Sequence, residues 1–268
     1  MKRRIVYTCL PEAYGLVYDQ LEEWSKLDIA LVKVDQKYKF KDRSYIQYCA
    51  YMPTKINVNF DVKYEAAGRM AIMLGWGHFI KWREIEDKTD YNQNTLRFAS
   101  TTIFSKQECK KYFNKPNLSD LIDNFMICTY EPGDLDDKGQ VKHNRRKHII
   151  NLNDTIETAE NDHGGPLISW VEGAEYVIGV ASVFRVNGKS ECIGPYLFTS
   201  TARNRIFIDC VLNEKNNLRR SSICDKPAIE RGFNIIEHHV PWIEKSDGPA
   251  QNEKIQKRPQ IPISNYRG

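Results

Sequence analysis

The sequence predicts an all-β protein built from short antiparallel strands. Four short and mostly apolar runs are typical of strands: residues 29–34, 70–74, 167–171 and 176–181. Clusters of Gly, Asn, Asp and Pro, such as Glu131-Pro132-Gly133-Asp134, separate the runs and predict turns. Helix signals are few, and many short strands with little helix favour an antiparallel barrel or sandwich.

Three short segments are the predicted helices. Ser105 followed by Glu108 is a capping-box pattern, in which the Ser hydroxyl accepts the backbone N–H of the Glu. This pattern predicts a short helix that runs through about Phe113. Residues 118–125 and 201–212 are weaker helical segments. No internal repeat is present in the sequence, so nothing in it indicates a solenoid or a propeller.

The bulk composition excludes several classes of protein. The 268 residues are 41% hydrophobic and 28% charged, which is enough apolar material for a packed core. The net charge of +4 is too weak to indicate a dedicated nucleic-acid binder. The longest nearly apolar run, 176–184, has about half the length of a membrane-spanning helix. The start, Met1-Lys2-Arg3-Arg4, is followed by polar residues that interrupt any signal peptide. We therefore expect neither nucleic acid nor a membrane as a partner.

The seven cysteines indicate an oxidising compartment. Their odd number leaves at least one thiol free or paired with another chain. None forms a Cys-x-x-Cys pair, which argues against zinc ribbons and redox motifs. We expect a disulfide-bearing, extracellular protein with no metal and no other cofactor.

Two polar segments stand apart from the strand pattern. Residues 134–147 predict an exposed loop, either a solvated one, which we favour, or a polyanion-binding or processing site. The basic residues of this loop are Lys138, Lys142, Arg145, Arg146 and Lys147. Residues 213–268 predict a basic, loosely ordered tail with one apolar island at 233–243. His238-His239 in this island is more readily a polar stretch of tail than a metal site.

The run Asp162-His163-Gly164-Gly165-Pro166-Leu167 is the sharpest motif. It resembles Gly-Asp-Ser-Gly-Gly-Pro-Leu of the trypsin/chymotrypsin-like serine protease family. In that family the Ser attacks the scissile carbonyl, and backbone N–H groups of the motif form the oxyanion hole. The nucleophile position of this chain holds His163. As a metal ligand His163 lacks companions at metal spacing apart from the adjacent Asp162.

Other family-like runs follow in family order over residues 20–212. Residues 27–34 resemble the strand that carries the triad aspartate, here Asp28, and Gly75-Trp76-Gly77 resembles the start of the second barrel. Residues 196–199 resemble the strand before the final helix. The resemblance implies a chymotrypsin-like double antiparallel β-barrel with a short C-terminal helix. The later half of the first barrel would be residues 1–62, which leaves it incomplete, and the second barrel and helix would be residues 63–212.

The departures from the family pattern imply a catalytically inactive homologue. The triad histidine would lie about 45 residues before Asp28, so we expect it to be absent from an N-terminally truncated chain. Asn161 replaces the oxyanion Gly, and Phe184, in Ser182-Val183-Phe184, replaces a pocket Gly and should plug the pocket. Glu157 aligns with the residue at the pocket floor. Asp162 is retained, in a zymogen-like arrangement.

The resemblance also implies a partial disulfide map. It predicts a Cys109–Cys128 bridge, and Ala71 and Ser169 occupy the two ends of a family disulfide that is lost here. Cys49 becomes a candidate for pairing outside this chain. The resemblance leaves several cysteines without an assigned partner: Cys9, Cys192, Cys210 and Cys224.

These observations favour a non-catalytic serine protease homologue that acts by binding. The resemblance implies a cofactor or decoy role in an extracellular proteolytic cascade, with an unidentified protein partner. Candidate surfaces are the former cleft around Asn161, His163 and Phe184, and the basic loop. The alternative is a fragment of a trypsin-like serine endopeptidase whose upstream half is missing; a decayed gene product is a third. An incomplete first barrel exposes strand edges, so either an upstream segment is missing or the tail or a partner covers them.

Overall fold

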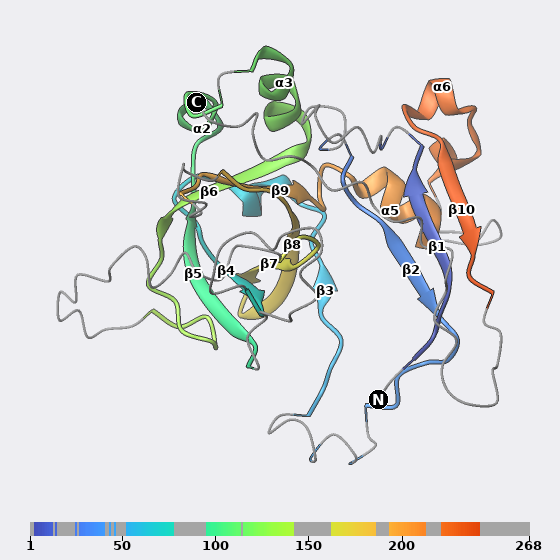
Figure 1. Cartoon of the computed structure of the whole chain (residues 1–268), viewed down its shortest axis with the longest axis horizontal. Helices are drawn as coiled ribbons and strands as arrows, with labels where there is room; N and C mark the ends of the chain where they lie inside the picture. Colours follow the sequence, from blue (N-terminus) through green and yellow to red (C-terminus); the bar gives the residue numbers. More distant parts are fainter. Residues whose placement is uncertain are drawn as a thin grey trace, which may run out of the picture.

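The computed structural model describes residues 3–12, 14, 25, 27–40, 43, 46, 52–77, 95–113, 115–141, 162–185, 193–212 and 221–241. These residues form mostly strands with a few short helices, in agreement with the predicted all-β class. Two β-structures lie side by side, a closed barrel and a three-stranded sheet, and one helix lies between them (Figure 1). No helix of the described part has both the length and the apolar content to cross a membrane.

Six antiparallel strands form the closed barrel. Their order is β8-β7-β4-β5-β6-β9, and β9 pairs again with β8, which completes the ring. The strands are β4 (Met70–Gly75), β5 (Arg97–Ile103), β6 (Met126–Pro132), β7 (Pro166–Val171), β8 (Ala174–Val183) and β9 (Tyr196–Ser200). Their bounds agree with the sequence-predicted runs at 70–74, 167–171 and 176–181 within a few residues. A second closed barrel is not present among the described residues.

Apolar side chains fill the barrel. Leu167, Ile178 and Phe198 are each at most 1% exposed and belong to one buried cluster with Ile127 and Ala71. Burying a side chain such as Phe198 contributes roughly 1.5–3 kcal/mol to folding. A short parallel strand, β3 (Asn57–Val58), extends the sheet beside β8.

Two short helices cover the β6 side of the barrel. α2 (Lys106–Lys110) begins after Ser105, whose hydroxyl accepts the Glu108 N–H at 3.1 Å, as the capping-box pattern predicted. It ends earlier than predicted, because residues 111 and 112 form a turn. α3 (Pro116–Phe125) begins two residues before its predicted start, with Pro in its first turn. The predicted Cys109–Cys128 disulfide is present and ties α2 to β6.

The three-stranded sheet contains one strand from the tail. Its antiparallel order is β10-β1-β2, with β1 (Ile5–Pro11) in the centre, β2 (Leu31–Val34) at one edge and β10 (Ile235–His239) at the other. α5 (Arg205–Leu212) packs against the sheet through a buried cluster that contains Ile29, Phe207 and Ile208. The tail strand therefore covers one edge of β1, which is one of the alternatives that the sequence left open.

Residues 221–241 are folded, although the sequence predicted a loosely ordered tail from residue 213 onward. They form η3 (Ser222–Asp225), α6 (Ala228–Arg231) and β10. The reason is the apolar island, because Phe233 and Ile235 pack against the same cluster as Phe207. The rest of the predicted tail, 213–220 and 242–268, lies outside the described residues.

The predicted exposed loop at 134–147 is partly built into the core. Leu135 is 6% exposed and packs with Ile72 and Ile168, and a β-bridge pairs it with Val141. The Asp136 carboxylate accepts the backbone N–H groups of residues 138 and 140, which closes this turn. Lys138 is exposed on it, whereas the other basic residues of the loop, 142–147, lie outside the described residues.

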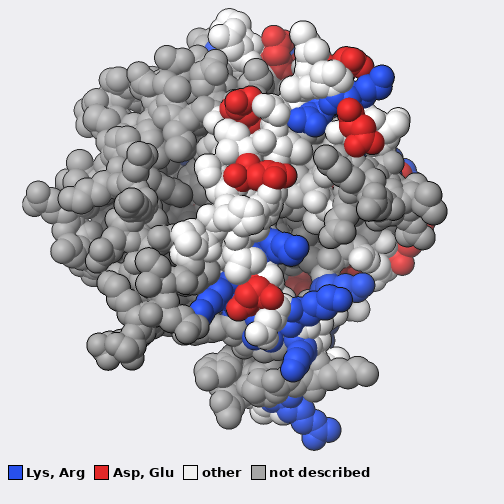
Figure 2. All heavy atoms as spheres, turned by 90° about the vertical axis from the view of Figure 1, so that its right-hand side faces the viewer, with Lys and Arg blue, Asp and Glu red and all other residues white. Residues whose placement is uncertain are grey.

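Charge is unevenly distributed over the side of the molecule that carries the three-stranded sheet. Basic side chains gather over the lower part of this face, whereas acidic side chains predominate over its upper part (Figure 2). The lower part corresponds to the end of the sheet where β1 begins and β2 ends (Figure 1).

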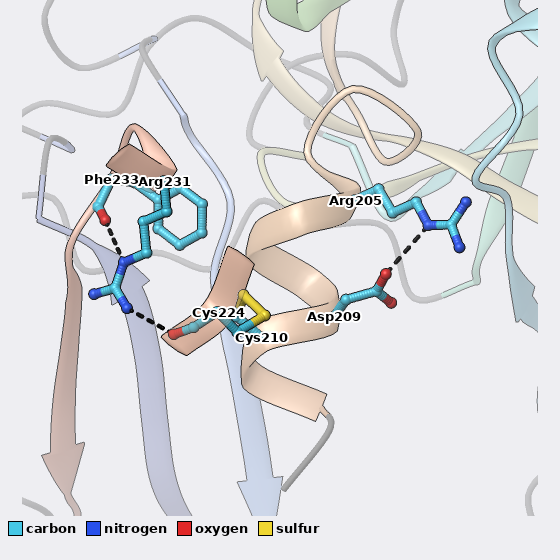
Figure 3. The surroundings of a disulfide bond; sticks show 6 residues. All are labelled: Arg205, Asp209, Cys210, Cys224, Arg231 and Phe233. Carbon is cyan, nitrogen blue, oxygen red and sulfur yellow. Dashed lines mark hydrogen bonds and ion pairs between the residues drawn. A yellow bond between two sulfur atoms is a disulfide. The ribbon is translucent and has the colours of Figure 1, made fainter. Parts of the chain in front are cut away.

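A second disulfide fixes the tail onto the helix. Cys210 in α5 is bonded to Cys224 in η3, a pair for which the sequence assigned no partner (Figure 3). Beside it the Arg231 guanidinium donates to the carbonyl oxygens of Phe233, at 2.7 Å, and Cys224, at 3.3 Å. The bridge and these bonds hold the segment that leads into β10.

Candidate functional site

Four of the predicted site residues lie in the described part of the chain, and they lie near one end of the barrel strands. Asp28 precedes β2, Asp162 and His163 precede β7, and Phe184 follows β8. The other predicted residues, namely Asn161, Glu157, Lys142, Arg145, Arg146, Lys147, Cys49 and Cys192, lie outside the described residues.

Asp28 contacts a serine that is distant in the sequence. The Ser182 hydroxyl in β8 donates to an Asp28 carboxylate oxygen at 2.6 Å, across 154 residues of sequence. Ser182 has no exposed surface. Burial raises the pKa of Asp28, and the bond from Ser182 partly opposes this by stabilising the charged form. The carboxylate is therefore a half-buried group whose charged form is partly stabilised by this serine.

The backbone before Asp28 adopts an uncommon conformation. Leu27 has a φ of 54°, in the left-handed region that a side chain with a Cβ disfavours by roughly 1–2 kcal/mol. Leu27 is 7% exposed, so burial of its side chain offsets this cost. The kink is followed at once by Asp28, whose carboxylate meets Ser182.

The Asp162 carboxylate binds the backbone of the Gly75-Trp76-Gly77 run. It accepts the N–H groups of Trp76 at 3.0 Å and Gly77 at 3.1 Å. Burial raises its pKa, while these two N–H groups lower it. A Cβ at Gly75 would lie only 2.0 Å from Asp162 Cγ, so this approach requires glycine.

Three rings stand in a row beside this carboxylate. The ring centroids of His163 and Phe184 are 4.9 Å apart, and those of Phe184 and Tyr196 are 5.8 Å apart. His163 is exposed, Phe184 is half-buried and Tyr196 is 5% exposed. A cavity of only about 10 Å³ remains between Phe184, Asp162 and the barrel strands, which is barely enough for one water molecule. Aromatic atoms thus occupy this part of the site.

The chemistry available to these groups is limited. Asp28 lies against a hydroxyl, and His163 lies against an aromatic ring. Nucleophilic catalysis of the serine protease kind needs a hydroxyl and an imidazole in contact with each other. The described residues also contain no group of three metal-binding side chains.

Sequence reasoning missed two participants in the site. Ser182 lies in the run that contains Phe184, and its partner Asp28 is too distant in sequence for any local pattern to connect the two. Tyr196 was identified as a strand residue, although its ring extends the row beyond Phe184. The family resemblance placed Asp28, His163 and Phe184 at a common site, but it assigned no role there to Ser182 or Tyr196.

Comparison with known proteins gave no match, either to the models of protein families or to curated protein sequences. The resemblance to trypsin-like proteases therefore depends on the order of the sequence motifs.

Proposed function

We propose that this chain is a non-catalytic serine protease homologue, with a chymotrypsin-like fold and an incomplete first barrel, that acts by binding. The contact between Asp28 and Ser182 carries the proposal. The resemblance aligned Asp28 with the triad aspartate, and it aligned residues 182–184 with a run that faces the substrate pocket. These two segments are 154 residues apart, and their meeting at one point supports the alignment.

Two further contacts support the same alignment. β4 and β7 pair with Ile72 opposite Ile168, and one further step in this antiparallel register brings Ala71 beside Ser169. These are the two positions that the resemblance assigned to one lost disulfide. The Cys109–Cys128 bridge follows the same alignment.

The residues at the former active site favour binding over hydrolysis. His163 has no hydroxyl, and Phe184 and Tyr196 fill the space beside it. Trp76 is 52% exposed, and its N–H binds Asp162, the residue before His163. An exposed Trp is typical of contact surfaces, because large aromatic side chains contribute much of the binding energy at interfaces. We assign the partner to an extracellular proteolytic cascade, in which the chain serves as cofactor or decoy.

A direct test is labelling with a fluorophosphonate probe together with peptide-ester hydrolysis. The wild-type chain and the variant His163→Ser should both remain unlabelled and inactive, with trypsin as the positive control. The single reversion restores a hydroxyl but supplies no imidazole in contact with it. Labelling or turnover by the wild-type chain would support the alternative, a fragment of a serine endopeptidase, and would overturn the proposal.

The binding surface can be tested by site-specific crosslinking. A photoreactive phenylalanine analogue replaces Trp76 in one variant and Val62 in a matched control, since both side chains are 52% exposed. In extracellular fluid from the source of the protein, we expect covalent capture of a protease or protease zymogen at position 76 and not at position 62. Equal capture at both positions, or none at position 76, would contradict a binding role for this surface.

A further inference from the structure

Basic residues gather at the end of the three-stranded sheet where β1 begins. The pairing of Ile5 with Val34 aligns this end, and the Asp35 N–H donates to the Arg4 carbonyl at 2.9 Å. Basic side chains cover this part of the molecular surface (Figure 2). We name this patch the basic sheet end: Arg3, Arg4, Lys33, Lys37 and Lys39.

Ordered contacts build this surface. The Arg3 guanidinium donates to the Lys37 carbonyl at 3.3 Å and lies over the Tyr38 ring, 5.8 Å from its centroid. Tyr38 in turn stacks on Phe40, with centroids 6.2 Å apart and an angle of 27° between the rings. Tyr38 is 43% exposed, so the stack presents an accessible ring beside the cations. The segment that carries Lys37 and Lys39 is thus anchored on both sides of each lysine.

Positive charge dominates this end of the sheet. Asp35 is the one acidic residue within the described segments 3–11 and 31–40, against five basic ones. Lys33, Lys37 and Lys39 are exposed and form no ion pair with other described residues. Clustered like charges repel, and an anionic chain laid across them would relieve the repulsion.

We propose that the basic sheet end binds a sulfated polysaccharide. The two disulfides fit an extracellular protein, and basic patches of this size bind linear sulfated glycans. Nucleic acid is a poorer match, because the whole chain carries a net charge of only +4. This site is separate from the former catalytic cleft, so it goes beyond the proposed function and does not depend on it.

The test is binding of the full chain to immobilised heparin at about 0.15 M salt. The variant Lys33→Ala/Lys37→Ala/Lys39→Ala should bind roughly 30-fold or more weakly and should show a shallower salt dependence. Its matched control removes the same charge from the predicted basic loop: Arg145→Ala, Arg146→Ala and Lys147→Ala. If the sheet end is the binding site, that control should lose less than about threefold in affinity.

A loss of heparin affinity confined to the loop variant, or an equal loss of affinity in both variants, would overturn the proposal. So would tighter binding of duplex DNA, or of phosphatidylserine vesicles, than of heparin at the same salt concentration. If the sheet-end variant fails to fold, lysine acetylation of the wild-type chain replaces it. Heparin should then protect Lys33, Lys37 and Lys39 at least about fivefold more than the exposed Lys138. Equal acetylation of these lysines with and without heparin would refute the site.

Discussion

Replacement of Ser182 by alanine should destabilise the protein, because the half-buried Asp28 carboxylate loses a hydrogen-bond donor. Ser182 has no exposed surface, and its hydroxyl lies 2.6 Å from the Asp28 carboxylate. A hydrogen bond to a charged group contributes roughly 1.5–3 kcal/mol net, so Ser182→Ala should lower the free energy of unfolding by about that amount at pH 7. Urea denaturation followed by circular dichroism measures this change.

The pH dependence follows from the raised pKa of Asp28. Burial raises this pKa above its ordinary value of 3.8, so the folded state favours the protonated form of Asp28. The resulting contribution to the free energy of unfolding is fully present below pH 3.8. This contribution is lost as the pH rises through the folded-state pKa. The hydrogen bond from Ser182 stabilises the charged form of Asp28, which predominates at pH 7. Ser182→Ala should therefore lower the free energy of unfolding more at pH 7 than at about pH 4.

A double-mutant cycle isolates the bond. In an Asp28→Asn background the Ser182 hydroxyl donates to a neutral amide oxygen. Ser182→Ala should therefore lower the free energy of unfolding by about half as much in that background. A cost below about 0.5 kcal/mol at pH 7, or an identical cost in both backgrounds, would refute the reasoning about a compensated buried charge.

Three further predictions concern the scaffold around the site. Removing the second disulfide with Cys210→Ser and Cys224→Ser should lower the free energy of unfolding by about 3 kcal/mol, since it releases a loop of about 15 residues. Amide hydrogen exchange in β10 should accelerate in the same variant, and unchanged protection would contradict a role in holding the tail. Gly75→Ala should cost at least about 2 kcal/mol, because the added methyl overlaps the Asp162 carboxylate; a thermal melt equal to wild type would exclude that overlap. Burial lowers the pKa of Lys106 to about 8, so its contribution to stability is present above pH 10.5 and is lost as the pH falls through about 8. Lys106→Met should therefore be more favourable relative to wild type at pH 7 than at pH 10, and an equal difference at both pH values would argue against the burial effect.

Local patterns predicted the elements whose signals are local. Ser105 with Glu108 placed the start of α2, and the apolar runs placed β4, β7 and β8. Their alternation and turn residues depend on neighbours along the chain, so a single sequence carries that information.

Contacts between distant segments were predictable only in part. The Cys109–Cys128 bridge came from the resemblance, whereas Cys210–Cys224 had no such guide, because spacing alone does not determine disulfide connectivity. The apolar island in the tail was visible in the sequence, but its register on β1 was not. A short apolar segment can pair with several different strands, and tertiary packing determines which pairing forms.

The pairing of β10 with β1 affects the order in which the chain can fold during synthesis. Tyr7 donates to the Glu237 carboxylate, and these two residues are 230 positions apart. The barrel has all its strands once residue 200 has left the ribosome, whereas β1 has to wait for some forty more residues before its second edge is covered. Domains form as their chains emerge, and contacts of long sequence separation form slowly. β1 is thus synthesised before the barrel strands but completed after them, and the nascent chain carries its open edge until β10 has emerged.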